Sequence, residues 1–563
     1  MSHRKVTVLP LVVAVLLPIL SVAQTVVRGP YLQTPAPDSI IVKWRTDIAT
    51  DSAVGYAQVG GAPSSVSSSA LTTDHEVTLT SLSPDTLYNY AIGTTIQVLA
   101  GGDLNSGGDG EHFFTTSPNS GTDKPTRVWV IGDSGTANAN AAAVRDAYKA
   151  FTGNRGTDVW LMLGDNAYSG GTDTEYQAAV FDMYPQMLRQ VPLWSAFGNH
   201  DAIDGFFNPP GAYPQIFSFP TAGESGGVGS GAETYYSFDY GSIHFISLDS
   251  TTNANRAAGS PMWTWLVADM AANTQDWTVV FWHHPHYSKG SHDSDTEIAL
   301  QEMRQNGLSL LEAGGVDLVL TGHSHSYERS HLVNGHYGLS SSLLPSMILD
   351  GGDGKEFGDG AYIKMGPPGT PNEGAVHAVV GSSGKTEAGG TLDHPVMYTS
   401  QLTLGSMVLD VSGNQLDAAF IDTSGTVLDE FTIIKSPPQV VAIDIQPWDA
   451  TNMVKPSSNN PISVAVLGSS IAEGGSADFD ASLVNPATVR LGIGEAPNIA
   501  IPWVQDVDGD TLDDILIGFR TQETGILCGD AEVSLAGETI GGSAFIGTDT
   551  IDTSDCENLG CHP

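Results

Sequence analysis

The sequence predicts a multidomain protein in which a central α/β layered domain lies between an N-terminal β-sandwich and a C-terminal all-β module. Two patterns support this prediction. Short apolar strands alternate with helix-like segments in the middle of the chain, whereas the regions before residue 118 and after residue 437 show only β-like segments. Hydrophobic residues make up 40% of the 563 residues, which is enough for sizeable cores and excludes wholesale disorder.

The first residues have the pattern of a secretory signal peptide. Basic residues precede an apolar run from Val6 to Leu20, and small residues follow up to Ala23. The run is shorter than the ~20 residues of a membrane span and contains two prolines. We therefore expect a signal peptide at 1–23, a secreted protein and no transmembrane anchor.

Residues 25–118 alternate as β-strands do. Ile40–Trp44 is an expected strand, and Tyr88 and Tyr90 stand where a β-sandwich turns a corner. This region resembles a fibronectin type III module. A structural attachment to the next domain is favoured over a carbohydrate- or partner-binding domain.

The central region, 124–436, reads as alternating strands and helices. Expected strands are 128–131, 159–163, 192–197, 243–248, 278–282 and 316–320, and expected helices are 138–151, 174–189, 262–271 and 297–311. Continuous apolar strands between helices are typical of sheets that are covered on both faces.

Polar residues follow five of these strands directly. The segments are Gly132-Asp133-Ser134-Gly135, Gly164-Asp165-Asn166-Ala167-Tyr168, Gly198-Asn199-His200-Asp201, His283-His284-Pro285-His286-Tyr287 and Gly322-His323-Ser324-His325. In α/β sheets, ligands bind outside the carboxyl ends of strands. We therefore expect these side chains to form one site.

The donor types fit two metal ions. All three cysteines lie near the C-terminus, so this site must use oxygen and nitrogen ligands. Seven candidate donors exceed the four that a tetrahedral zinc takes, and two metal ions can share a bridging carboxylate. Carboxylate, phenolate, amide oxygen and imidazole suit iron, manganese or zinc.

At these five blocks the chain resembles the purple acid phosphatases, within the metallophosphoesterase superfamily. Tyr327-Glu328-Arg329 adds to the resemblance, which covers about residues 25 to 436, and Tyr168 is its most specific feature. The resemblance implies a four-layered α-β-β-α catalytic domain. It also implies ferric iron held by Asp133, Asp165, Tyr168 and His325, and a divalent ion (Fe2+, Zn2+ or Mn2+) held by Asp165, Asn199, His283 and His323.

Two choices within the site rest on finer arguments. His283 is favoured over His284 as a ligand by its spacing from Val280 in Val280-Phe281-Trp282-His283, and neighbouring side chains on a strand point to opposite faces, so only one of the two can face the metals. By the resemblance, His200 and His292 occupy positions of phosphate-contacting histidines, and one of them donates a proton to the leaving group. The residue after His292 is Asp293, an anion where plant-type relatives commonly carry another histidine. His292 as an ordinary solvated loop residue is the alternative.

Residues 437–563 form the expected C-terminal module, after the linker Ser436-Pro437-Pro438. Its expected strands are 440–445, 462–467 and 488–491. A possible calcium loop has acidic residues at positions one, three, five and nine, namely Asp506, Asp508, Asp510 and Asp514. The alternative is a merely acidic turn. The module's role is surface or glycan attachment or partner binding. Cys556 and Cys561 are one possible disulfide pair, with Cys528 left over.

The expected function is hydrolysis of small phosphate monoesters by a hydroxide held at the binuclear centre. The chain has 22 Lys and Arg against 63 Asp and Glu, a net charge of −41. That charge repels phosphate backbones and excludes a nucleic-acid scaffold. The alternatives are a phosphodiesterase or nucleotide hydrolase with the same metals, and a non-catalytic, calcium-dependent surface protein.

Overall fold

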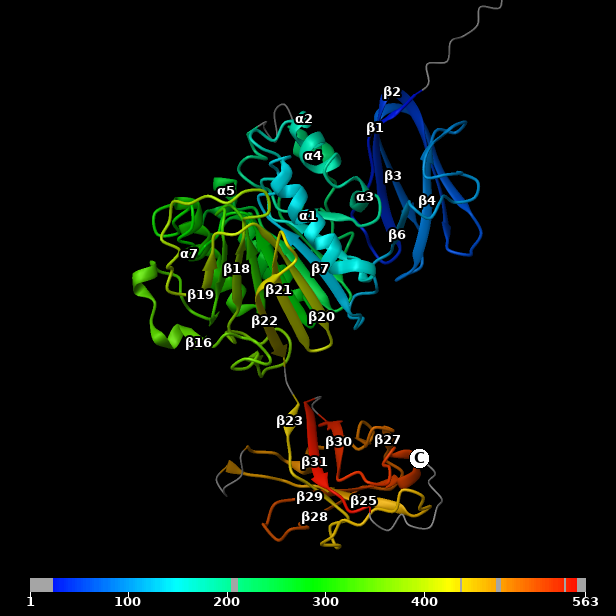
Figure 1. Ribbon diagram of the computed structural model, residues 1–563, viewed down its shortest axis with the longest axis vertical. Helices are drawn as coiled ribbons and strands as arrows, with labels where there is room; N and C mark the ends of the chain where they lie inside the picture. Colours follow the sequence, from blue (N-terminus) through cyan, green and yellow to red (C-terminus); the bar gives the residue numbers. More distant parts are fainter. Residues whose placement is uncertain (1–23, 204–210, 436–437, 472–476, 541–542, 554–563) are drawn as a thin grey trace, which may run out of the picture.

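The computed structural model describes residues 24–203, 211–435, 438–471, 477–540 and 543–553. The expected signal peptide at 1–23 lies outside these residues, as do residues 436 and 437 of the expected linker. Figure 1 shows an N-terminal β-region beside a larger central domain, and a smaller C-terminal module at one end of that domain. No helix of the described residues is long and apolar enough to cross a membrane.

The N-terminal region is built around one long strand. Its strands are β1 (Val26–Gln33), β2 (Ser39–Gln58), β3 (Ser64–Thr80), β4 (Leu87–Gly93), β5 (Val98–Ala100) and β6 (Phe113–Thr115). The first half of β2 pairs with β1 and the second half pairs with β4. The backbone N–H of Ser83 donates to the Tyr88 hydroxyl (2.9 Å), as in a tyrosine corner. These features are compatible with the expected sandwich, and the fibronectin type III identity stays a prediction.

The central domain contains two seven-stranded sheets. The first has the order β17 (Tyr362–Lys364), β22 (Val427–Lys435), β21 (Gln415–Asp422), β20 (Gly405–Ser412), β7 (Thr126–Ile131), β8 (Val159–Met162) and β9 (Leu193–Ser195). The second has the order β10 (Tyr236–Tyr240), β11 (Ile243–Ser247), β12 (Trp277–Trp282), β13 (Leu318–Thr321), β18 (Val376–Val380), β14 (Tyr327–Ser330) and β19 (Met397–Gln401). A short hairpin of β15 (Leu332–Val333) and β16 (Ile348–Asp350) stands apart.

The alternation of side chains along β12 explains the layers. Val279 and Phe281 belong to the same apolar cluster as Val128 of the other sheet, whereas Val280 and Trp282 pack with residues of α6 (Pro261–Ala272) and α7 (Ile298–Ala313). Successive side chains on a strand face opposite sides. One face of the second sheet therefore packs on the first sheet and the other face packs on helices. On the other side, α1 (Ala139–Thr152) stacks Tyr148 on Trp129 of β7. The metallophosphoesterase-type α/β fold is thus present.

One expected helix is wrong. The segment 174–189 is broken into α2 (Asp173–Tyr176), a π-helical turn (Gln177–Phe181) and α3 (Pro185–Leu188). Pro185 has no N–H to donate within a helix, so the helix restarts there with proline at its first position. The other expected helices occur, and Asn138 caps α1 by accepting from the backbone N–H groups of Asn140 and Ala141. Two further short helices are α4 (Ala212–Ile216) and α5 (Asn253–Arg256).

The C-terminal module has its own apolar cluster, shared by two small sheets. One sheet has the order β23 (Gln439–Val440), β31 (Ala544–Thr550), β30 (Glu532–Glu538), β26 (Arg490–Leu491) and β27 (Ala496–Pro497). The other has the order β24 (Ile443–Ile445), β25 (Pro461–Val466), β29 (Asp514–Arg520) and β28 (Trp503–Gln505). The single strand expected at 440–445 is therefore two strands in different sheets. Cys528 is disulfide-bonded and so is not the odd cysteine; the other two cysteines lie outside the described residues.

Candidate metal centre

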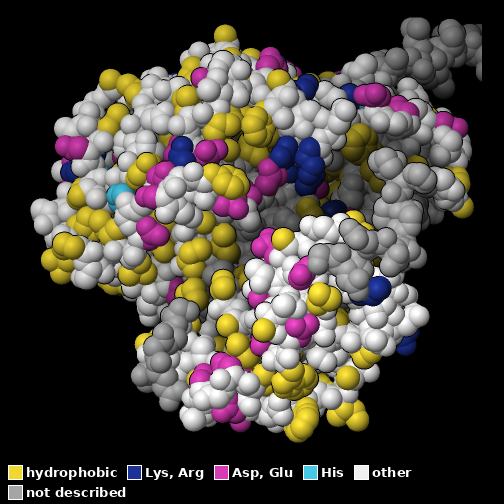
Figure 2. Space-filling model, turned by 60° about the horizontal axis from the view of Figure 1, so that its bottom comes forward, with side chains coloured by type: hydrophobic (Ala, Val, Ile, Leu, Met, Phe, Trp, Pro, Cys, Tyr) yellow, Lys and Arg dark blue, Asp and Glu magenta, His cyan; other side chains and the backbone are white. Residues whose placement is uncertain are grey.

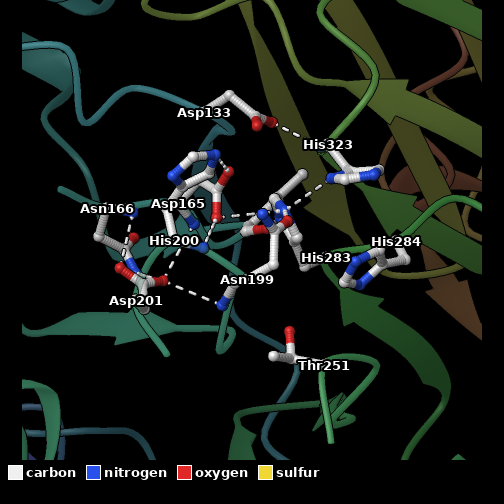
Figure 3. Close-up of polar contacts among 12 residues, drawn as sticks. Asp133, Asp165, Asn166, Asn199, His200, Asp201, Thr251, His283, His284 and His323 are labelled. Atoms are coloured by element: carbon white, nitrogen blue, oxygen red, sulfur yellow. Dashed lines mark hydrogen bonds and ion pairs between the residues drawn. The ribbon is translucent and has the colours of Figure 1, made fainter. Parts of the chain in front are cut away.

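The loops after five strands from both sheets meet at one place. β7, β8 and β9 run parallel in the first sheet, and β12 and β13 run parallel in the second. Their carboxyl ends carry all seven side chains expected to bind metal. Figure 3 shows five of these side chains directed toward one another: Asp133, Asp165, Asn199, His283 and His323.

Three of the seven form one group. The Tyr168 hydroxyl donates to Asp133 Oδ1 (2.8 Å), and His325 Nε2 lies 3.5 Å from the same oxygen. His325 Nε2 also lies 3.4 Å from the Tyr168 hydroxyl. These are three of the four residues expected to hold ferric iron.

The other four form a second group. His283 Nε2 lies 3.0 Å from Asn199 Oδ1 and 3.3 Å from Asp165 Oδ1. His323 Nδ1 lies 3.2 Å from His283 Nε2. Asp133, Asp165 and His283 also offer ligand atoms within 4.8 Å of one another, so the two groups adjoin.

The histidine tautomers show that this donor set fits cations. His283 Nδ1 faces the carbonyl oxygen of Leu163 (2.9 Å), and His325 Nδ1 faces a carboxylate oxygen of Glu387 (2.8 Å). Each Nδ1 must therefore carry the proton, which leaves the lone pair of each neutral ring on Nε2. Each Nε2 therefore points into the donor group: it donates to the oxygens there while the ring is charged, and in the neutral ring its lone pair is available to a cation.

The electrostatics of the site also favour the binding of cations. Burial lowers the pKa of His283, but the carboxylates of Asp165 and Asp133 overcome this and raise it to about 9. Burial and the same two carboxylates hold the pKa of Tyr168 well above its usual value. The pocket therefore has a strongly negative field that favours positive charge.

Glycine before the expected ligands permits the close approach of these loops. A Cβ on Gly198 would lie 2.2 Å from the backbone nitrogen of Asp165, and one on Gly164 would lie 2.7 Å from His283 Nδ1. In addition, Asp133, Asp165 and His323 have positive φ angles of 54°, 53° and 64°. Such left-handed backbone is costly for residues other than glycine and clusters at functional sites.

The two expected proton donors lie beside the centre. His200 Nδ1 contacts the carbonyl oxygen of Ser169 (2.6 Å), and its Nε2 lies 3.9 Å from Asp165 Oδ2. The His292 ring lies against the His323 ring, with 3.7 Å between centroids. Asp293 pairs with Lys289 (2.7 Å), so its charge is partly neutralised near the position expected for phosphate.

His284 lies beside this group and bonds outside it through one ring nitrogen. Its Nδ1 contacts the Ser250 hydroxyl (3.0 Å). Burial and neighbouring positive groups hold the pKa of His284 well below its usual value, so the ring is neutral. Its ring still lies near His323, and His283, His284 and His323 together offer another set of donors within 4.8 Å.

Sequence reasoning missed several residues that position this site. Asp201 accepts from the backbone N–H groups of Asp165 and Gly198 and from the side chain of Asn166. Glu387 holds His325, and Glu297 contacts His292 (2.9 Å). Asp201 was visible in the third block as the acid after Asn199 and His200. No motif marked Glu297 or Glu387.

The acidic loop of the C-terminal module is only partly gathered. Asp506, Asp508 and Asp514 offer oxygens within 4.8 Å of one another, and the group does not include Asp510. The Asp514 carboxylate accepts from the backbone N–H groups of Gly468 and Val507. Three of the four expected calcium ligands therefore lie together.

The part of the chain that carries this donor set is similar to a known family of phosphoesterases. Residues 126–327 match the family model described as calcineurin-like phosphoesterase, and the match includes all seven expected ligands. This part of the chain is therefore similar to that family.

Comparison with individual proteins narrows the resemblance. The chain is 28% identical over 309 residues to purple acid phosphatase 15 of Arabidopsis thaliana, covering 50% of this chain and 53% of the relative. It is 31% identical over 216 residues to purple acid phosphatase 18 of the same plant, covering 36% and 44%. The chain thus spans about half the length of these curated relatives.

Among solved structures, a purple acid phosphatase from yellow lupin shares the fold. Its TM-score is 0.55 at 18% identity, with 72% of this chain and 75% of that chain covered. PhoD shares it with a TM-score of 0.51 at 14% identity, covering 72% and 90%. The comparisons confirm the resemblance to purple acid phosphatases and support the predicted enzyme class, a phosphoesterase hydrolase.

Proposed function

We propose that this protein is a secreted acid phosphatase that hydrolyses small phosphate monoesters at a binuclear metal centre. The observation that carries the proposal is the arrangement of seven buried or half-buried donors in two adjoining groups, with Asp165 between them. In this proposal Asp133, Tyr168 and His325 hold ferric iron and Asn199, His283 and His323 hold Fe2+, Zn2+ or Mn2+. Asp165 bridges the two ions.

Two ions held this way would supply Lewis acidity toward the phosphoryl oxygens and would lower the pKa of bound water. The residues of the chain supply the rest. Leu163 and Glu387 fix which nitrogen of each histidine faces the centre. The Ser169 carbonyl holds the Nδ1 proton of His200, so Nε2 faces the centre, and the imidazolium form of the ring can pass its Nε2 proton to the departing alkoxide. His292 is the second candidate for this role.

The test is an assay of the purified protein with determination of its bound metals. Hydrolysis of p-nitrophenyl phosphate and of bis-p-nitrophenyl phosphate is measured between pH 4 and pH 9. We expect two metal ions per chain, preference for the monoester, and loss of about a hundredfold or more of activity in Asp165→Asn. Asp146→Asn, a change on the exposed face of α1, is the matched control and keeps full activity.

Other outcomes identify the alternatives. Preference for the diester would replace the proposal with a phosphodiesterase or nucleotide hydrolase. Two bound metals with no turnover of either ester would instead favour a non-catalytic surface protein.

We also propose that the C-terminal module binds one calcium ion and serves in surface attachment. The three clustered carboxylates support the calcium site. Burial and the neighbouring acids Asp510, Asp514 and Asp506 raise the pKa of Asp508, which indicates mutual repulsion that a cation would relieve. Secretion rests on the pattern of residues 1–23 and is tested by sequencing the N-terminus of the exported protein, which we expect to begin at Gln24.

A further inference from the structure

Lys385 lies against the expected iron ligand Tyr168. Its Nζ is 4.1 Å from the centroid of the Tyr168 ring, and its side chain is half-buried. Lys385 lies beyond the residues that match the family model, and the sequence motifs did not mark it.

This lysine has no carboxylate partner among the described residues. The neighbouring Lys289 pairs with Asp293 and Asp295. Glu387, only two residues along the chain, directs its carboxylate to His325. The Lys385 ammonium group is therefore not in an ion pair among the described residues, although its charge acts through space on the nearby Glu387 and His325.

The loop that carries Lys385 is fixed in place. It follows β18, and the backbone N–H of Ser383 donates to the Gly132 carbonyl (3.1 Å) while the N–H of Gly132 donates to the Ser383 hydroxyl (3.2 Å). A Cβ on Gly384 would lie 2.6 Å from the carbonyl oxygen of Asp133. The loop thus packs tightly on the Asp133 loop, and the lysine is positioned before any ligand binds.

We propose that the Lys385 ammonium group binds a non-bridging phosphate oxygen of the substrate and selects monoesters over diesters. The inference rests on the proposed function. A lysine binds phosphate as a point charge, and a monoester near pH 7 carries close to two negative charges on its phosphate, whereas a diester carries one. An added cation at the rim of the centre therefore stabilises the monoester more near pH 7, and the difference shrinks below the second phosphate pKa of about 6.

The test compares Lys385→Met, Lys385→Arg and the control Lys149→Met in the metal-loaded protein. Lys149 lies on the exposed face of α1 and its Nζ bonds Gln186, so the control removes the same charge from a residue that takes no part in the centre. Calorimetry measures the binding of inorganic phosphate at pH 7. We expect Lys385→Met to weaken it by about tenfold or more, and Lys385→Arg to recover part of the loss.

Kinetics give the second readout. In Lys385→Met we expect kcat/KM to fall about tenfold to a hundredfold for p-nitrophenyl phosphate and less than about threefold for bis-p-nitrophenyl phosphate, with metal content unchanged. Unchanged phosphate affinity, or an equal loss for both esters, overturns the inference. A wild-type protein that binds phosphate but hydrolyses neither ester overturns the proposed function alone, because the calorimetric comparison still decides the role of Lys385. A wild-type protein that binds no phosphate overturns both.

Discussion

Tyr168 is the single residue with the most distinctive physical signature. Its hydroxyl lies 2.8 Å from Asp133 Oδ1, within the group expected to hold ferric iron. A phenolate bound to ferric iron absorbs visible light. We predict a visible absorption band in the iron-loaded protein that Tyr168→Phe abolishes. A colourless iron-loaded wild-type protein, or a band that survives the substitution, would show that Tyr168 is not a ligand.

Asp201 is a second residue on which the site depends, although it is not an expected metal ligand. Its carboxylate accepts from Asp165, Gly198 and Asn166, and also from the Tyr176 hydroxyl (2.6 Å). Asparagine keeps the size but loses one acceptor. We predict that Asp201→Asn weakens metal binding by about 10- to 100-fold, which is typical for changes to residues that hydrogen-bond to metal ligands and orient them. The measurement is metal content after dialysis against a graded chelator series. Retention equal to that of the wild type would show that Asp201 does not position the ligand loop.

At the scale of elements, a buried histidine ties β10 and β11 to α6. His244 lies on β11, its Nδ1 contacts Asp239 of β10 (2.7 Å), and its Nε2 contacts Asp269 of α6 (2.9 Å). Burial lowers the pKa of His244, but the two carboxylates overcome this and raise it to about 9. The ring is therefore charged in the folded protein at neutral pH.

This tie makes stability depend on pH. Because the folded pKa exceeds the ordinary value of about 6.5, its contribution is complete below about pH 6.5 and is lost as pH rises through about 9. We predict that the free energy of unfolding of the wild type, relative to His244→Gln, falls by at most about 3 kcal/mol over that window. Denaturant unfolding at several pH values measures this difference. A difference that stays constant from pH 6 to pH 9.5 would contradict the prediction.

The N-terminal region is attached to the loop beside the centre. Arg28 of β1 and Arg45 of β2 both pair with Asp173 at the start of α2 (2.8 Å each). The turn before α2 contains Ser169, whose carbonyl fixes His200. This contact supports the structural role favoured for the N-terminal region, because its strands brace the loop that positions a proton donor.

At the scale of the whole molecule, acidic side chains dominate. Figure 2 shows Asp and Glu spread over the displayed face, with Lys and Arg confined to a few places. Salt at about 0.15 M screens such charge beyond about 8 Å, so it does not prevent an anionic ester from binding at contact distance. The net negative charge of the protein also gives no long-range attraction for an anionic ester. Phosphate must therefore be recognised by cationic groups that contact it directly, such as Lys385.

The C-terminal module has an apolar cluster of its own and carries the expected calcium ligands. We predict that added calcium raises the unfolding temperature of the C-terminal module, and that Asp508→Asn removes this shift. Asp510→Asn is the matched control and keeps most of it, because the group of three carboxylates does not include Asp510. If both variants lose the calcium-induced shift equally, Asp510 is also a ligand, as the sequence spacing predicts. If calcium does not shift the unfolding temperature of the wild type, the loop is only an acidic turn.

Much of the domain could be predicted from sequence because local patterns encode it. Apolar runs such as 128–131 and 278–282 became strands of the central sheets, and the glycine-led blocks after them carried the expected ligands. Pro185 was a visible breaker whose effect on the helix at 174–189 was missed. That the five strands belong to two sheets followed only from the resemblance to a known family and not from local patterns, because β-pairing depends on distant residues. Lys385 and Glu387 were missed for the same reason, since only packing brings their loop to Asp133.

The most direct test of the central claim is X-ray diffraction from crystals of the metal-loaded protein, collected at the iron absorption edge. We predict two metal ions about 3.5–4 Å apart, one beside Tyr168 and one beside Asn199, with the Asp165 carboxylate in contact with both. A single ion, or two ions that Asp165 does not bridge, would contradict the account.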